Sequence, residues 1–166
     1  QKNHFLLLEV AQKLKEFYLD WTFHLIGKDF EDEYSKQIKN KIKEYDLENN
    51  VFIYGTRQDV AHILSQSEIA VLTSQSEGLP VALLEYGLYK KAVVVTNVGE
   101  MPMIVQHKKN GFIVDSDDPD LFYQSVVDLM TNEILRSDFG MALYETIQVN
   151  YTAESVMKKY LNWLQI

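Results

Sequence analysis

The chain has 166 residues, 46% hydrophobic and 12% aromatic, which fits one globular domain with a substantial core and excludes a disordered segment. The formal net charge of −8 argues against binding to DNA, RNA or anionic lipid, because such partners require clustered lysine and arginine side chains. The absence of cysteine excludes disulfides and thiolate chemistry, and no apolar run approaches the roughly 20 residues that a membrane span requires.

Short strands rich in β-branched residues alternate with helical segments along the chain. We predict, in order, helix 4–19, strand 22–26, helix 31–45, strand 51–54, helix 58–66, strand 69–73, helix 80–90, strand 92–96, helix 101–106, strand 112–114, and helices 119–131, 133–148 and 153–165. Because parallel strands require crossover connections, this alternation predicts an α/β fold with a doubly wound parallel sheet and helices on both faces. The residues expected to begin helices as side-chain caps are Asn3, Asp59, Asp118 and Thr152.

The most informative segment follows the predicted strand 69–73 and leads into a helix. It contains Glu77, then Gly78, which frees the turn, and Pro80, which fits the first position of a helix. The backbone N–H groups of such a junction are free to meet an anionic or hydroxyl-rich ligand. The plain alternative for Glu77 is an acid that is favoured near a helix N-terminus.

A second acid, Glu85, lies on the second turn of the predicted helix among apolar residues. Lys90 and Lys91 follow it by five and six residues, outside the spacings at which helical ion pairs form. If the carboxylate turns inward it needs a partner, and a ribose diol with two O–H donors would serve. The alternative is a solvated charge on an exposed face.

Glycines follow other predicted strands, at Gly27, Gly55 and Gly99. Ligands of doubly wound sheets bind outside the carboxyl ends of the strands, so we expect these glycines to border one crevice, although each could be a turn residue alone. The four histidines have no spacing typical of a metal site, and we expect no metal centre.

The paired glutamates resemble the hallmark of the retaining nucleotide-sugar glycosyltransferases of family 4, also called group 1, in which seven residues separate two glutamates. Ser74, Glu77, Gly78 and Glu85 match that motif position by position. Further segments resemble the strands, loops and last helix of the family: 51–55, 92–99, 110–114 and 151–152. The resemblance spans residues 1–166 and implies a single Rossmann-like, nucleotide-sugar-binding domain, the C-terminal half of a two-domain enzyme of GT-B architecture.

The resemblance also implies roles for individual residues. Glu77 would be catalytic, contacting the donor sugar at the reacting centre, and Glu85 would hold the ribose. Lys2 would pair with the donor phosphates, unless it is an ordinary exposed lysine. The remaining predicted substrate-binding residues shape the sugar pocket or lie near the base: Gly78, Leu79, Pro80, Tyr54, Gly55 and Thr56. Pro80 has no N–H to donate.

These implications lead to a functional hypothesis. The full-length protein would be a retaining hexosyltransferase that needs no cofactor or metal, takes a nucleotide-diphosphate sugar as donor and builds a bacterial capsular or surface polysaccharide. It would be cytoplasmic, with access to the inner face of the membrane. A missing N-terminal domain would bind the saccharide or lipid-linked acceptor, because the start at Gln1 suggests a truncated chain, and the isolated fragment would be inactive.

Two other functions stay open. Glu100 and Met103 stand where the family usually has a glycine and a glutamate, which would suit a partner subunit that binds the nucleotide sugar without turnover. A sugar-nucleotide epimerase of related fold would use a similar crevice, and fold alone does not separate these functions.

Overall fold

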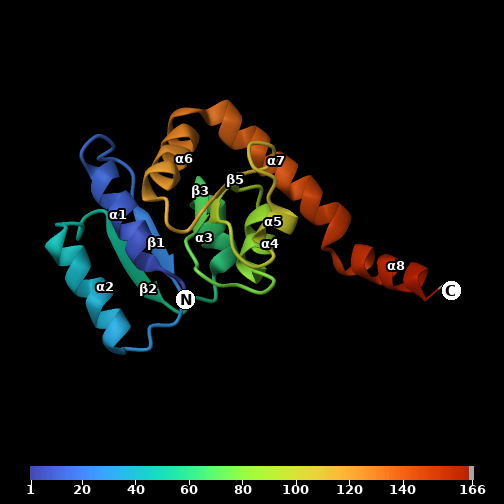
Figure 1. The fold of residues 1–166 in the computed structure, drawn as a ribbon, viewed down its shortest axis with the longest axis horizontal. Coiled ribbons are helices and arrows are strands. Elements are labelled where there is room, and N and C mark those ends of the chain that lie inside the picture. The colour runs from blue at the N-terminus through green and yellow to red at the C-terminus, as the bar shows by residue number, and fades with distance from the viewer. Residues whose placement is uncertain (165–166) are drawn as a thin grey trace.

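The computed structural model describes residues 1–164 (Figure 1). Every predicted helix and strand is present, with ends that shift by a few residues. The elements are α1 (His4–Lys15), β1 (Phe23–Ile26), α2 (Glu33–Glu44), β2 (Val51–Gly55), α3 (Val60–Gln66), β3 (Ile69–Leu72), α4 (Val81–Leu88), β4 (Ala92–Thr96), α5 (Met101–Ile104), β5 (Phe112–Val114), α6 (Pro119–Thr131), α7 (Glu133–Asn150) and α8 (Ala153–Trp163). The α/β class is therefore confirmed.

The strands are all parallel, as predicted, but they form two sheets instead of one continuous sheet. β1 pairs with β2, and β3, β4 and β5 pair in that order. Phe23 lies opposite Val51 in the first sheet, and Ile69 lies opposite Ala92 in the second. Within residues 1–164, β4 pairs along both edges, and each of the other strands pairs along one edge only.

Helices cover both faces of the β3–β4–β5 sheet, as the doubly wound prediction requires. Side chains of α1 and α6, including Leu14 and Phe122, pack on one face with Val94. Leu83 of α4 and Leu143 of α7 pack on the other face. All five residues of β4 are buried, which is typical of a central strand covered on both sides.

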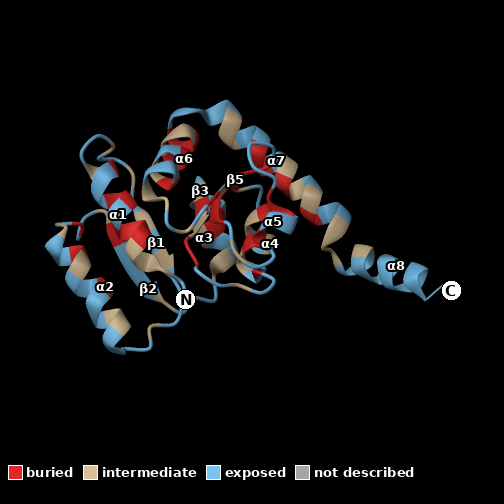
Figure 2. Ribbon diagram, viewed as in Figure 1, coloured by how far each residue is buried: buried red, intermediate tan, exposed pale blue. Residues whose placement is uncertain are grey.

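The first sheet, at the left of Figure 1, is covered on one face by α1 and α2. Much of the ribbon of these two strands is exposed (Figure 2), and the exposed residues of the open face include His24, Phe52 and Tyr54. There His24 stacks between Phe52 and Tyr54, with ring centroids 5.5 Å apart in both pairs. The β1–β2 sheet therefore has one covered and one open face in the described chain.

All four predicted residues occupy the N-cap positions of their helices, but only two of them make a side-chain cap bond. Asp118 accepts a hydrogen bond from the backbone N–H of Leu121, and Thr152 accepts one from Ser155. Asn3 instead adopts a left-handed conformation, with φ of 49°, and its side chain makes no cap bond. The carboxylate of Asp59 is engaged by Arg57, whose hydrogen bond lowers the pKa of Asp59 to about 2.

The last helix, α8, extends away from the rest of the chain (Figure 1), and none of its described residues is buried. Its large apolar side chains are exposed, and two of them, Tyr160 and Trp163, stack on each other. In residues 1–164, no helix combines the length and the apolar character needed to cross a membrane.

Candidate active site

The loop between β3 and α4 carries the first glutamate of the motif. The apolar strand ends at Leu72, and the next two residues, Thr73 and Ser74, are buried polar residues. α4 begins at Val81, so Pro80 occupies the N-cap position and not the first helical position that we predicted. Its carbonyl still accepts the first bond of the helix, from the N–H of Leu83.

The N-terminal segment lies beside this loop, although the two are more than 70 residues apart in sequence. The backbone N–H of Gln75 donates to the carbonyl of Gln1 at 2.8 Å. The hydroxyl of Thr73 donates to the carbonyl of Lys2 at 2.9 Å. These bonds bring Lys2 to the loop, as expected of a residue that shares a site with Glu77.

Lys2 and Glu77 are in direct contact. Oε1 of Glu77 accepts hydrogen bonds from Nζ of Lys2 at 2.6 Å and from Oγ of Ser74 at 2.7 Å. The Glu77 side chain is 11% exposed and that of Lys2 is 57% exposed. Desolvation alone would raise the pKa of Glu77, but the bonds from Lys2 and Ser74 outweigh it and lower that pKa. Glu77 is therefore held as an oriented carboxylate.

The loop after β4 packs against the loop that carries Glu77. Gly99 has φ of +57°, and a Cβ built there would lie 1.9 Å from the carbonyl oxygen of Glu77. Only glycine fits such a close approach of two backbones. Gly99 thus borders the Glu77 loop, whereas the expectation that Gly27, Gly55 and Gly99 share one crevice stays a prediction. Gly78, by contrast, has no atom within 4 Å of a built Cβ, so its surroundings are open.

The second glutamate of the motif is placed differently. Glu85 lies on α4 with an exposed side chain, and in residues 1–164 its carboxylate has no hydrogen bond or ion pair. The exposed side chain matches the alternative of a solvated charge, and the contact with a ribose stays a prediction. The next residue, Tyr86, is half-buried, and desolvation, with the charge of Glu85, raises the pKa of its hydroxyl to about 12.

The residues predicted near the base lie at the end of the other sheet. The N–H of Gly27 donates to the carbonyl of Gly55 at 3.0 Å, so the carboxyl ends of β1 and β2 are joined. The hydroxyl of Tyr54 lies 3.0 Å from Nδ1 of His24, and Thr56 is exposed beyond the strand. Tyr54, Gly55 and Thr56 thus form a second group, next to the first sheet.

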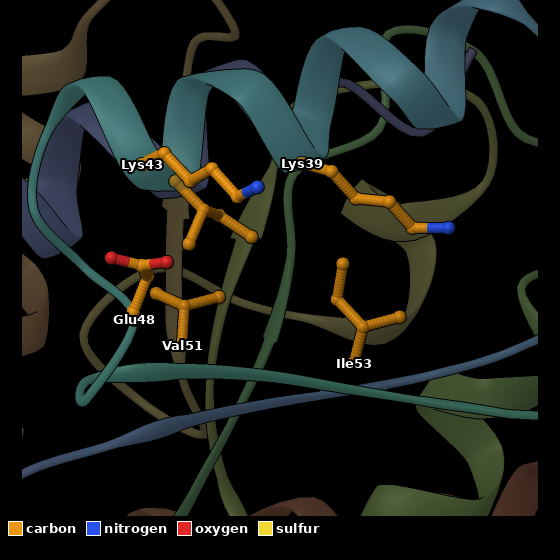
Figure 3. Close-up of a pocket in the computed structure, with 6 residues that line it drawn as sticks. Lys39, Lys43, Glu48, Val51 and Ile53 are labelled. Atoms are coloured by element: carbon orange, nitrogen blue, oxygen red, sulfur yellow. The ribbon is translucent and has the colours of Figure 1, made fainter.

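A shallow groove of about 270 Å³ lies between α2 and β2 (Figure 3). Lys39 and Lys43 extend from the helix over Val51 and Ile53 of the strand. Nζ of Lys39 pairs with Asp29 at 2.6 Å. The groove contains none of the predicted site residues.

Sequence reasoning missed three supporting residues of the site. Ser74 matched the motif but received no role, Gly99 was expected only to border the crevice, and Thr96 was not considered. The only available signal for Thr96 was a hydroxyl at the end of an otherwise apolar strand run, from Ala92 to Val95. A buried hydroxyl requires a partner, and here that partner is the loop itself.

Comparison with known proteins identifies the family, because the family described as Glycosyl transferases group 1 matches residues 1–146. The chain belongs to the group 1 glycosyltransferases. A poly(ribitol-phosphate) alpha-N-acetylglucosaminyltransferase of Staphylococcus aureus (strain COL) is 29% identical over 158 residues, which are 95% of this chain and 31% of the relative. The chain thus spans about a third of that relative.

Solved structures agree with the family assignment. The crystal structure of a mutant of S. aureus TarM in complex with fondaparinux, alpha-GlcNAc-glycerol and UDP has a TM-score of 0.87 and 28% identity, over 97% of this chain and 32% of that chain. The C-terminal domain of a group 1 glycosyltransferase family protein (LpcC) from Francisella tularensis has a TM-score of 0.83 and 24% identity, over 92% of this chain and 80% of that chain. The fold is that of a C-terminal GT-B domain, as the resemblance implied.

Proposed function

We propose that the full-length protein transfers a sugar, with retention of configuration, from a nucleotide diphosphate to an acceptor, and that residues 1–166 form the single domain that binds the donor. The contact of Lys2 with Glu77 beside the open backbone at Gly78 carries the proposal. This constellation of a cation, a carboxylate and an accessible loop follows a parallel strand of a group 1 glycosyltransferase domain. Such strand ends are where α/β sheets bind ligands.

The two charges suit the two demands of the reaction. Sugar transfer develops negative charge on the leaving diphosphate and positive charge at the anomeric carbon. Lys2 has an exposed amine that can turn to the diphosphate, and the amides of Gly78 and Leu79 add fixed dipoles next to Pro80. Oε2 of Glu77 is left for a sugar hydroxyl, since the two bonds given above go to Oε1. We propose no cofactor or metal in this scheme.

The nucleotide would extend from this loop to the other sheet. Glu85 has a carboxylate exposed to an incoming ribose, and the backbone at Tyr54, Gly55 and Thr56 would border the base. The TarM complex, which contains UDP, supports a nucleoside diphosphate as the ligand class.

The acceptor would be a saccharide or a lipid-linked chain bound by a further N-terminal domain of the same protein. The S. aureus relative is named for transfer to a polymer, poly(ribitol-phosphate), which supports a role in building a bacterial capsular or surface polysaccharide. Donors of this kind would be used on the cytoplasmic side of the membrane.

Product analysis with the full-length protein tests this function. It is incubated with labelled UDP- or GDP-sugars and a saccharide acceptor, and the anomeric configuration of the product is read by NMR. A new glycoside with the configuration of the donor supports the proposal. An isomerised donor would indicate an epimerase. Nucleotide binding without either product would indicate the non-catalytic subunit that Glu100 and Met103 leave open.

A further inference from the structure

Glu77 is connected to the centre of the sheet through two buried hydroxyls. Oγ of Ser74 donates to Oε1 of Glu77 at 2.7 Å, and the carbonyl of Ser74 accepts from Oγ1 of Thr96 at 2.6 Å. Ser74 is 1% exposed and Thr96 is 0% exposed. The Thr96 bond is buried and the Ser74 bond is part-buried, so both lie in surroundings less polar than water, where hydrogen bonds are stronger.

Thr96 provides a fixed anchor for this chain of bonds. It ends β4, the strand that pairs on both sides and is buried along its whole length. Three residues later, Gly99 packs against the backbone of Glu77. The end of β4 and the following turn thus hold the loop at two points, one on the Ser74 carbonyl and one on the Glu77 carbonyl.

The two partners of Glu77 differ in mobility. Lys2 has a long and mostly exposed side chain, and in the proposed function its amine turns to the donor diphosphate. Ser74 is buried, so its hydroxyl stays in place when Lys2 leaves. After the donor binds, Ser74 is then the protein group that keeps Oε1 of Glu77 occupied and Oε2 aimed at the sugar.

We infer that Ser74 and Thr96 are positioning residues, which act on sugar transfer by holding the Glu77 carboxylate; this inference rests on the proposed function. Neither side chain needs to touch the donor. Their loss is expected to lower turnover with little change in nucleotide affinity, because a misplaced catalytic group reduces the rate more than it reduces binding.

The variants are made in the full-length enzyme. Ser74→Ala removes the hydroxyl, and we expect kcat to fall between about 10-fold and 100-fold, the range for loss of a hydrogen bond to a charged group. The affinity for UDP is expected to stay within about twofold. Thr96→Val keeps the volume and loses the hydroxyl, whereas Thr96→Ser keeps the hydroxyl. The valine variant is expected to lose more activity than the serine variant.

Two controls separate positioning from general stability. Ser125→Ala removes another buried serine hydroxyl, which donates to the carbonyl of Leu121 within α6, and is expected to leave kcat unchanged. In a Glu77→Ala background, Ser74→Ala is expected to have almost no further effect on kcat, because a residue that acts through Glu77 loses its influence when that carboxylate is gone.

A titration that needs no activity completes the test. The Glu77 carboxyl, followed by carbon NMR, is expected to have a higher pKa in Ser74→Ala than in the wild type, with Lys2 present in both. An unchanged pKa would overturn the inference whether or not the enzyme transfers sugar. An active enzyme that loses activity in Glu77→Ala but not in Ser74→Ala would overturn the inference and leave the proposed function intact. A wild type that makes no glycoside would refute the function. The titration would still show whether the Ser74 hydroxyl stabilises the Glu77 carboxylate.

Discussion

Substitution of Gly99 by alanine tests whether the turn after β4 sets the position of Glu77. The new Cβ would lie 1.9 Å from the Glu77 carbonyl oxygen, and ordinary contact begins at 3.4 Å. One of the two loops must therefore move by about 1.5 Å, the difference between these distances. Because both atoms belong to or directly adjoin backbone, a side-chain rotation does not relieve the contact.

Both stability and activity are expected to change. The left-handed conformation of Gly99 adds about 1–2 kcal/mol of strain for alanine, which is partly offset by about 0.4–1 kcal/mol from the stiffer unfolded chain. When the cost of moving the two backbones apart is added, we expect the free energy of unfolding to fall by about 2 kcal/mol. A displacement above 1 Å at a catalytic group can lower the rate by about 100-fold.

The assay measures kcat of the full-length enzyme with its nucleotide sugar, together with the midpoint of thermal unfolding. Gly27→Ala is the stability control, because a Cβ at Gly27 has no atom within 4 Å and the backbone there is not left-handed. A Gly99→Ala variant with wild-type kcat and an unfolding midpoint equal to that of Gly27→Ala would refute the view that this turn positions Glu77.

Further expectations concern individual residues and the domain. Glu85→Ala is expected to weaken UDP or GDP binding by about 1.5–3 kcal/mol in calorimetry, whereas Glu77→Ala lowers kcat and leaves nucleotide affinity nearly unchanged; no effect of either would contradict the site. Gly140→Ala should cost about 1–3 kcal/mol of stability, since its Cβ would lie 2.1 Å from the Lys90 carbonyl, and a neutral result would argue against this packing. The pKa of Glu77 is lowered in the fold, so the stability advantage of the wild type over Lys2→Met, followed by urea unfolding, should be present at neutral pH and vanish as pH falls through that pKa; a constant difference would contradict the ion pair. Purified residues 1–166 are expected to form no glycoside, and measurable transfer by them would show that the acceptor site lies within this domain.

The order and type of the elements could be predicted because local preference and burial agree along most of the chain. The run from Ala92 to Thr96 is apolar, β-branched and short, and it forms the fully buried β4. Caps could be predicted only where no neighbour competes. The carboxylate of Asp118 accepts a hydrogen bond from a backbone N–H of its helix. The carboxylate of Asp59 instead accepts hydrogen bonds from Arg57, two residues earlier, and makes no cap bond.

Contacts between distant segments were beyond the reach of local patterns. Gly99 matched the family loop, but nothing in the sequence states that a Cβ at this position would meet the backbone of Glu77. The division of the strands into two sheets was equally invisible, because each strand has the same apolar character whether it pairs on one edge or two. Registers and close approaches depend on tertiary packing, which single-sequence periodicity does not encode.

The ion pair between Lys2 and Glu77 is a contact that the sequence did not predict, although both residues were assigned to one site. Each residue was assigned to a different part of a donor, a phosphate and a sugar. Opposite charges that share a site attract each other, and here Nζ of Lys2 and Oε1 of Glu77 lie 2.6 Å apart. Because the Lys2 amine is largely exposed, the pair contributes at most about 1 kcal/mol. Under the proposed function, a diphosphate would therefore draw Lys2 from Glu77 at little cost, and Glu77 would keep its bond from Ser74.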